Sequence, residues 1–224
     1  MTAHLFLDLD GTLIDSCEGI YYSYIKACNH MLIGYPELKL FSQKIGPPIE
    51  NIFSYFNPQS TSADVENFKM IFRAIYNEEG VKISKCYEDV ALQLHYLSKQ
   101  LDLTLSVITN KPTYPAISIL KSHSIFSLFK SVIGSDYLHY HHIGDPFRDK
   151  CQAIKYAINK YSVDISRTIY VGDTTSDLEA AQAAGIHFVA AIYGYHNWTD
   201  NELIGISVLK EPLNLFSVIE DLLN

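Results

Sequence analysis

Short apolar segments alternate with longer segments of mixed polarity along most of this chain. Five of the short segments are almost continuously apolar, without a regular alternation of polar and apolar side chains. Such runs are typical of parallel strands that are covered on both faces of a sheet. The predicted strands span residues 4–9, 103–109, 131–135, 168–172 and 188–193.

Helical patterns follow the last four of these strands. They span residues 114–122, 149–161, 178–184 and about 213–223. Gly185 follows the third helix directly, as is typical of a helix end. This alternation predicts an α/β domain with a doubly wound, mainly parallel, five-stranded Rossmann-like sheet and right-handed crossovers.

The connection between the first two strands is longer than one crossover needs. About 90 residues intervene, although a single helix of a dozen residues would be enough. Apolar stripes predict helices over residues 20–32, 49–56, 65–75 (with Gly80 ending the helical segment) and 90–97. We therefore expect an inserted all-helical domain at residues 17–81, and an α/β core domain made of residues 1–16 and 82–224.

Composition and charge narrow the possible partners. The chain has 224 residues, 48% of them apolar, and a formal net charge of −8. An acidic protein is a poor ligand for the phosphate backbone of nucleic acids, so we expect no nucleic-acid partner. The four cysteines form no C-x-x-C pair, and we expect four reduced thiols.

Nothing in the sequence indicates a membrane or a leader segment. The first ten residues, MTAHLFLDLD, lack the basic region of a signal peptide, and no apolar run approaches the roughly 18 residues of a membrane helix. We expect a soluble cytoplasmic protein with no membrane partner, either a monomer or a homodimer.

Polar residues gather where three of the predicted strands end. In a doubly wound sheet, ligands bind at the carboxyl ends of the strands, near the point where the strand order reverses. The first strand ends in Asp8-Leu9-Asp10-Gly11-Thr12, the second in Thr109-Asn110-Lys111 and the fourth in Gly172-Asp173-Thr174-Thr175-Ser176-Asp177. These segments predict a polar site at one edge of the sheet.

The chemistry of this site follows from its carboxylates. Four of them at one edge would repel one another, and a cation removes that conflict. Oxygen ligands without His or Cys suit Mg²⁺. A carboxylate can also attack a phosphoryl group, and Asp8 and Asp10, two residues apart, share one side of the strand end. Gly11 permits a sharp turn and close backbone approach.

A hydroxyl and an ammonium group would stabilise charge on a transferred phosphoryl group. Thr109 supplies the hydroxyl, and two lysines are candidates for the ammonium. Lys111 follows the second strand directly, whereas Lys150 lies four residues before Ile154, on the stripe that packs its helix against the sheet. We favour Lys150 and leave Lys111 as the alternative.

Together, these segments resemble the motifs of the haloacid dehalogenase superfamily. The segment beginning Asp8-Leu9-Asp10-Gly11-Thr12 resembles the first motif, Thr109-Asn110-Lys111 the second, and the segment from Gly172 to Asp177 the fourth. The inserted helical domain resembles the family's cap in its commonest position. The whole chain is most similar to the phosphoglycolate-phosphatase-like branch.

The resemblance implies a role for each matching residue. Asp8 would be the nucleophile, and Asp10 would protonate the leaving group and later activate water. Mg²⁺ would be held by Asp8, the Asp10 carbonyl group and Asp173, with Asp177 supporting its waters. Three residues would bind the phosphoryl group: Thr109, Asn110 and Lys150. Thr12 would brace the Asp8 loop.

The expected enzyme is thus a Mg²⁺-dependent phosphatase for a small phosphate monoester, such as phosphoglycolate, a sugar phosphate or a nucleotide monophosphate. A phosphomutase of the same family is the nearest alternative. From another class, a non-catalytic signalling or binding protein that carries a phospho-aspartate is also considered. A receiver domain of that kind would be much shorter and would lack the insertion. The sequence leaves the identity of the phosphate monoester open.

Overall fold

The computed structural model describes residues 2–224, and the chain divides into two compact units. One unit comprises the residues up to Ile14 together with Cys86–Asn224, and the other comprises Asp15–Lys85. We call them the core unit and the helical unit, and each is described by itself. No helix within residues 2–224 is long and apolar enough to cross a membrane.

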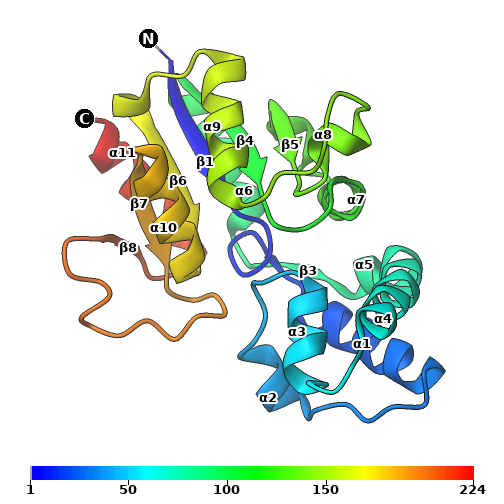
Figure 1. Ribbon diagram of the computed structural model, residues 1–224. Coiled ribbons are helices and arrows are strands. Elements are labelled where there is room, and N and C mark those ends of the chain that lie inside the picture. Colours follow the sequence, from blue (N-terminus) through cyan, green and yellow to red (C-terminus); the bar gives the residue numbers. More distant parts are fainter. Residues whose placement is uncertain (1) are drawn as a thin grey trace. The chain divides into compact units, whose positions relative to one another are not determined.

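The core unit is built on one parallel sheet (Figure 1). Its strands lie in the order β5-β4-β1-β6-β7-β8, and every neighbouring pair is parallel. They are β1 (Ala3–Leu7), β4 (Leu103–Ile108), β5 (Ser131–Ile133), β6 (Thr168–Gly172), β7 (His187–Ala191) and β8 (Ser207–Leu209). This arrangement confirms the doubly wound α/β fold predicted from the sequence.

The sheet has six strands, so the prediction of five was wrong by one. The additional strand, β8, contains only three residues at the edge of the sheet, and only Leu209 is fully buried. So short a segment has no continuous apolar run to reveal it. Two further short strands, β2 (Ile14–Asp15) and β3 (Lys85–Cys86), form a separate two-stranded sheet, and the unit boundaries fall within them.

Helices cover both faces of the large sheet (Figure 1). On one face, α9 (Lys150–Tyr161) and α10 (Thr175–Ala184) pack side by side, and on the other α6 (Val90–Gln100) packs against α11 (Leu215–Leu223). The remaining helices of this unit are α7 (Thr113–Ser122) and α8 (Tyr137–Tyr140). Short 3-10 turns occupy Phe126–Leu128, Ile165–Arg167 and Pro212–Asn214.

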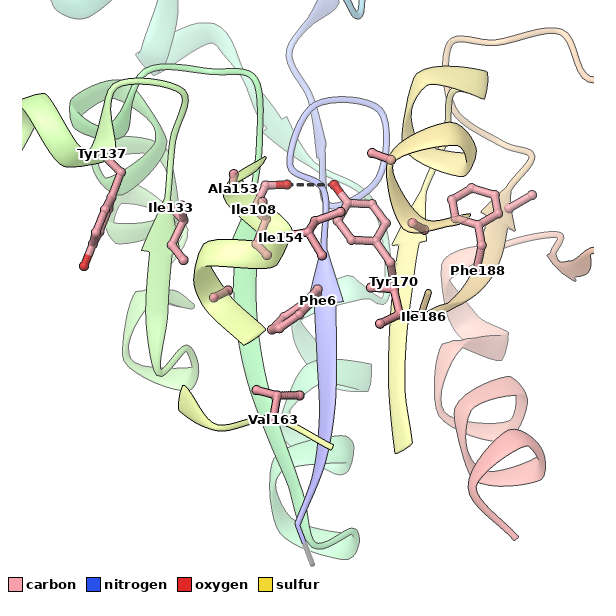
Figure 2. Packing of buried hydrophobic residues seen from close by; sticks show 14 residues of the cluster. Phe6, Ile108, Ile133, Tyr137, Ala153, Ile154, Val163, Tyr170, Ile186 and Phe188 are labelled. Atoms are coloured by element: carbon pink, nitrogen blue, oxygen red, sulfur yellow. Dashed lines mark hydrogen bonds between the residues drawn. The ribbon is translucent and has the colours of Figure 1, made fainter. Parts of the chain in front are cut away.

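The hydrophobic core under α9 and α10 fixes these helices against the sheet (Figure 2). Phe6 of β1 and Ile154 of α9 are fully buried there, as is Tyr170 of β6. The Tyr170 side chain carries a hydroxyl group into this apolar layer, and the hydroxyl donates a hydrogen bond of 2.8 Å to the carbonyl oxygen of Ile108. A buried hydroxyl without a partner would be costly, so this bond makes the tyrosine acceptable.

Local signals set the ends of the two helices that face the site. Asp149 caps α9 by accepting a hydrogen bond from the backbone of Gln152 at 2.8 Å. Thr174 and Asp177 form a reciprocal capping box at the start of α10. Gly185 ends α10 with a φ of +74°, which confirms the predicted helix end.

The helical unit contains only helices between its two short strands. They are α1 (Cys17–His30), α2 (Leu38–Ser42), α3 (Ile49–Phe56), α4 (Ser62–Ile75), a π-helical turn (Tyr76–Gly80) and α5 (Val81–Ile83). Aromatic rings fill its interior: Tyr24, Phe41, Phe53 and Phe68 are all fully buried, and the rings of Phe53 and Phe68 stack with centroids 4.0 Å apart.

The prediction that Gly80 ends a helix was wrong, because the helical backbone continues to Ile83. Gly80 is instead required by close packing. A β-carbon there would lie 2.5 Å from the hydroxyl oxygen of Ser23 and 2.8 Å from the carbonyl oxygen of Gly19. The absence of a β-carbon thus allows the π-helical turn to contact α1, and sequence periodicity does not reveal this requirement.

Candidate active site

The carboxyl ends of three adjacent strands meet at one edge of the sheet. Asp8 follows β1, Thr109 follows β4 and Asp173 follows β6, and β1 lies between the other two strands. The backbone N–H of Asp8 donates to the carbonyl of Val171 at 2.9 Å, which extends the ladder between β1 and β6. This edge is therefore where the predicted site residues come together.

Residues 8–14, which we call the Asp8 loop, turn sharply after β1. The backbone N–H of Leu13 donates to the carbonyl of Leu9, and that of Gly11 donates to the carbonyl of Ile14, each at 2.9 Å. Gly11 has a φ of +81°, and a β-carbon there would lie 2.1 Å from Asp173 Oδ2. Both the backbone conformation and the available space therefore require glycine, as predicted.

Three buried carboxylates form a cluster at the strand ends. Asp8, Asp173 and Asp177 each offer one oxygen, and these atoms all lie within 4.8 Å of one another. Burial raises the pKa of Asp8 to about 6, with the charge of Lys150 acting in the opposite direction. Burial, followed by the charges of Asp177 and Asp8, raises the pKa of Asp173 well above its usual range.

Within the described chain, Asp8 Oδ1 is buried and has no hydrogen-bond partner. An unpartnered, buried carboxylate oxygen among other carboxylates is an environment that a cation would stabilise. The donor set contains oxygen atoms only, so it suits a hard divalent cation. The cluster could therefore hold a metal ion.

Lys150 pairs with two of these three carboxylates. Its Nζ atom is 3.0 Å from Asp8 Oδ2 and also donates a hydrogen bond to Asp177 Oδ1. Burial opposes the charged ammonium, but Asp177 and Asp8 outweigh that effect and raise the pKa of Lys150 above its usual value. The position of Lys150 agrees with the stripe of α9 that predicts it, whereas its role in binding phosphate stays a prediction.

Lys111, the alternative lysine of the sequence analysis, also lies at the site, where it forms an ion pair that the sequence did not reveal. Its side chain is only 6% exposed, and Nζ lies 2.8 Å from Asp10 Oδ2. The Asp10 carboxylate thus pairs with Lys111, outside the cluster formed by the other three aspartates. The only feature of the sequence that could have indicated this pair is the position of Lys111 directly after a buried strand.

The remaining predicted residues line the same edge. Thr109 is buried, and its hydroxyl oxygen accepts a hydrogen bond of 3.2 Å from the backbone N–H of Lys111. Asn110 is half-buried at the same strand end. The hydroxyl of Thr12 donates to Asp173 Oδ1 at 3.4 Å. The contact between Thr12 and Asp173 joins the ends of β1 and β6, and the pair of Lys111 and Asp10 joins the ends of β4 and β1.

Asp177 has two structural roles at once. One oxygen completes the capping box of α10 with Thr174, and the other accepts from Lys150. The hydroxyl of Tyr170 lies 3.4 Å from the second oxygen. Sequence reasoning missed Tyr170; a tyrosine inside an otherwise apolar strand is the signal that could have indicated it, since its hydroxyl needs a polar partner.

Comparison with known proteins identifies the family of this chain. The family model of haloacid dehalogenase-like hydrolases matches residues 5–191. A phosphoglycolate phosphatase from Aliivibrio fischeri is 32% identical over 202 residues, which cover 85% of this chain and 84% of the relative.

Two solved structures are similar over almost their whole length. A putative phosphatase from Clostridium difficile is 28% identical and has a TM-score of 0.79, with coverage of 100% of this chain and 99% of that one. A predicted phosphatase from Clostridium acetobutylicum shares the fold, with a TM-score of 0.85 at 23% identity over 99% of both chains. The chain therefore belongs to the haloacid dehalogenase-like hydrolase family and is a hydrolase of the phosphatase type, as its motifs predict.

Proposed function

We propose that this protein hydrolyses small phosphate monoesters in a Mg²⁺-dependent reaction, through a phospho-aspartate on Asp8. The observation that supports this most directly is the state of the Asp8 carboxylate. One of its oxygens lies 3.0 Å from the ammonium of Lys150, and the other is buried without a partner. A carboxylate held on one side and unpartnered on the other is suited to act as a nucleophile.

The reaction would proceed in two steps. In the first, an Asp8 oxygen attacks phosphorus, the bond between phosphorus and the ester oxygen breaks, and Asp10 gives its proton to the leaving oxygen. In the second, Asp10 takes a proton from water as the water oxygen attacks phosphorus. The bond between phosphorus and Asp8 then breaks, which releases inorganic phosphate and restores the Asp8 carboxylate.

The cation would be held by Asp8, Asp173 and the backbone carbonyl of Asp10, with Asp177 supporting its waters. When bound, Mg²⁺ would supply positive charge that offsets the repulsion between an anionic phosphate and the carboxylates. The raised pKa values of Asp8 and Asp173 support this proposal, because burial and the charges of neighbouring aspartates disfavour the ionised carboxylates, and a bound cation would offset both effects. Mg²⁺ prefers such an all-oxygen environment.

Three side chains would bind the phosphoryl group. The Lys150 ammonium would neutralise its charge, and the Thr109 hydroxyl and the Asn110 amide would donate hydrogen bonds to its oxygens. Lys150 is suited to this role because two carboxylates keep it charged despite its burial. A fixed ammonium needs no reorganisation when negative charge develops on the phosphoryl oxygens.

The helical unit would act as a cap that selects the leaving group and excludes water. A cap domain favours small substrates, so we place phosphoglycolate, sugar phosphates and nucleotide monophosphates first. The name of the relative from Aliivibrio fischeri, phosphoglycolate phosphatase, supports a small phosphorylated acid among them.

Phosphate release from a panel of these monoesters tests the proposal. Wild-type protein is compared with Asp8→Asn, with and without Mg²⁺, and with Asp145→Asn, which changes an exposed aspartate of the core unit. Mg²⁺-dependent release that Asp8→Asn abolishes and Asp145→Asn retains is the expected result. Release that persists in Asp8→Asn would exclude a phospho-aspartate on that residue, and conversion of a sugar phosphate to its isomer without release would indicate a mutase.

A further inference from the structure

The turn that follows β7 contacts both the Asp8 loop and Asp173. It consists of Tyr193, Gly194 and Tyr195, at the start of the long segment between β7 and β8 (Figure 1). We call these three residues the β7 turn. None of them belongs to the motifs from which the site was predicted, yet each one contacts a residue of that site.

Tyr193 binds the backbone of the Asp8 loop. Its hydroxyl donates a hydrogen bond of 2.7 Å to the carbonyl oxygen of Thr12. The ring of Tyr87 packs against the Tyr193 ring with centroids 5.1 Å apart, and the backbone N–H of Tyr87 donates to the carbonyl of Leu13 at 3.1 Å. Burial raises the pKa of Tyr193, so the phenol stays protonated and remains a donor.

Gly194 provides the space that these contacts need. A β-carbon there would lie 2.3 Å from the Asp173 β-carbon and 2.5 Å from the carbonyl oxygen of Gly11. These distances are far below van der Waals contact, so any side chain would displace Asp173 or the Asp8 loop. The requirement for glycine is therefore one of close approach between backbone and side chain.

Tyr195 fixes the orientation of the carboxylate. Its backbone N–H donates to Asp173 Oδ2 at 2.8 Å, while the Thr12 hydroxyl donates to Oδ1. With one donor on each oxygen, the Asp173 carboxylate is held in a single plane. One donor comes from the β7 turn and the other from the Asp8 loop, so the two segments are joined through this aspartate.

We propose that the β7 turn is a positioning element, in which Tyr193 and Gly194 hold the Asp8 loop at a fixed distance from Asp173. The effect of this element on catalysis depends on the function proposed above, whereas its effect on the loop does not. Neither residue contacts the reacting atoms: Tyr193 acts through the Thr12 carbonyl, and Gly194 acts by leaving room for Asp173. Phosphoryl transfer depends on such alignment, because small displacements of the reacting groups cost large factors in rate.

Tyr193→Phe tests the hydroxyl, because it removes one hydrogen bond and keeps the ring. Tyr96→Phe is the matched control, since Tyr96 is 47% exposed on α6 and packs near Phe216. Hydrogen exchange is measured on peptides that cover residues 9–14. Tyr193→Phe is expected to raise the exchange rate of these amides at least fivefold over wild type, and Tyr96→Phe to leave it unchanged.

Kinetics on the preferred phosphate monoester, at saturating Mg²⁺, give a second readout. Tyr193→Phe is expected to lower kcat roughly fivefold to twentyfold and to change KM less than about twofold. A merely structural role would lower the melting temperature and leave kcat of the folded fraction unchanged. Unaltered kcat in folded Tyr193→Phe would therefore overturn the positioning role in catalysis, and unaltered exchange would overturn the role in holding the Asp8 loop.

Gly194→Ala tests the close approach with Mg²⁺ alone as the probe. Calorimetric titration of the folded variant is expected to give about tenfold weaker Mg²⁺ binding than wild type, because Asp173 is displaced. Equal Mg²⁺ affinity would contradict the role given to Gly194. If wild-type protein released no phosphate from any substrate, the proposed function would fail, while the exchange experiment would still decide the positioning role.

Discussion

The interiors of the two units differ in what they bury. At the strand ends of the core unit, Lys150, Asp173 and Asp177 are all at most 6% exposed. The helical unit instead buries a cluster of aromatic rings around Tyr24. Aromatic packing stabilises a fold directly, whereas buried charges stabilise it only when each is paired. The comparison indicates that the core unit accepts some cost to stability at the strand ends, where the proposed chemistry lies, whereas the buried interior of the helical unit contributes mainly stability.

Removing the Lys150 ammonium should have the largest effect on the charged interior of the core unit. Lys150→Met leaves Asp8 and Asp177 buried without their counter-charge, so we expect a loss of about 3–5 kcal/mol in the free energy of unfolding. Phosphatase activity should fall by a factor on the order of 10³ or more, because the same ammonium would bind the phosphoryl group. Denaturant unfolding and phosphate release measure the two effects.

Lys155→Met is the matched control for that variant. Lys155 lies on the same helix but is exposed, so the stability and the activity of the Lys155→Met protein should remain close to wild type. An intact free energy of unfolding in Lys150→Met would show that the buried pairs contribute little to stability.

A change in the aromatic interior should instead destabilise the helical unit and affect the core unit less. Phe53 is fully buried and stacks on Phe68, so Phe53→Ala should cost about 3–5 kcal/mol of stability in the helical unit. Trp198, the only tryptophan of the chain, lies in the core unit and reports on that unit separately. The part of the helical circular-dichroism signal that comes from the helical unit should therefore melt earlier than in wild type, while the fluorescence transition moves less. Equal shifts of both transitions would mean that the units unfold as one.

The charged cluster should also make stability depend on pH. Burial raises the pKa of Asp8 to about 6, above the value of 3.8 for an unperturbed aspartate. The folded state thus favours the protonated acid, and the protonated form of Asp8 adds to the free energy of unfolding. This stabilisation is complete below pH 4 and is lost as the pH rises through 6. In metal-free protein the loss should be about 3 kcal/mol, from a shift of roughly two pKa units.

Denaturant unfolding between pH 4 and pH 7.5, in the presence of a chelator, measures this contribution. Asp8→Asn removes the titrating group and should flatten that part of the pH profile. Saturating Mg²⁺ should restore stability near pH 7, since a cation favours the ionised carboxylates. An identical profile for Asp8→Asn and wild type would assign the pH dependence to other groups.

Local patterns predicted much of the fold and of the site. Apolar runs located five strands because buried parallel strands need continuous apolar residues, and the stripe of α9 oriented Lys150 correctly. Contacts between residues far apart in sequence were not accessible in this way. Asp10 and Lys111 are 101 residues apart, and Thr12 and Tyr193 are 181 apart. Which polar side chains meet at a strand end depends on the register and order of the strands, and no local periodicity encodes that information.

Breaking the pair of Lys111 and Asp10 should have the smallest effect of the changes considered. Lys111 Nζ lies 2.8 Å from Asp10 Oδ2, while 17% of the Asp10 side chain is exposed, so water can partly replace the ammonium when it is removed. Lys111→Met should therefore lower kcat only about tenfold to thirtyfold, by allowing the Asp10 carboxylate to move, with little change in KM. Lys111→Arg should recover part of the rate because it keeps a cation beside Asp10, and Lys99→Met, at an exposed position on α6, should match wild type. A large rise in KM with unchanged kcat would instead show that Lys111 binds the substrate, which would make it, rather than Lys150 alone, a phosphate-binding lysine.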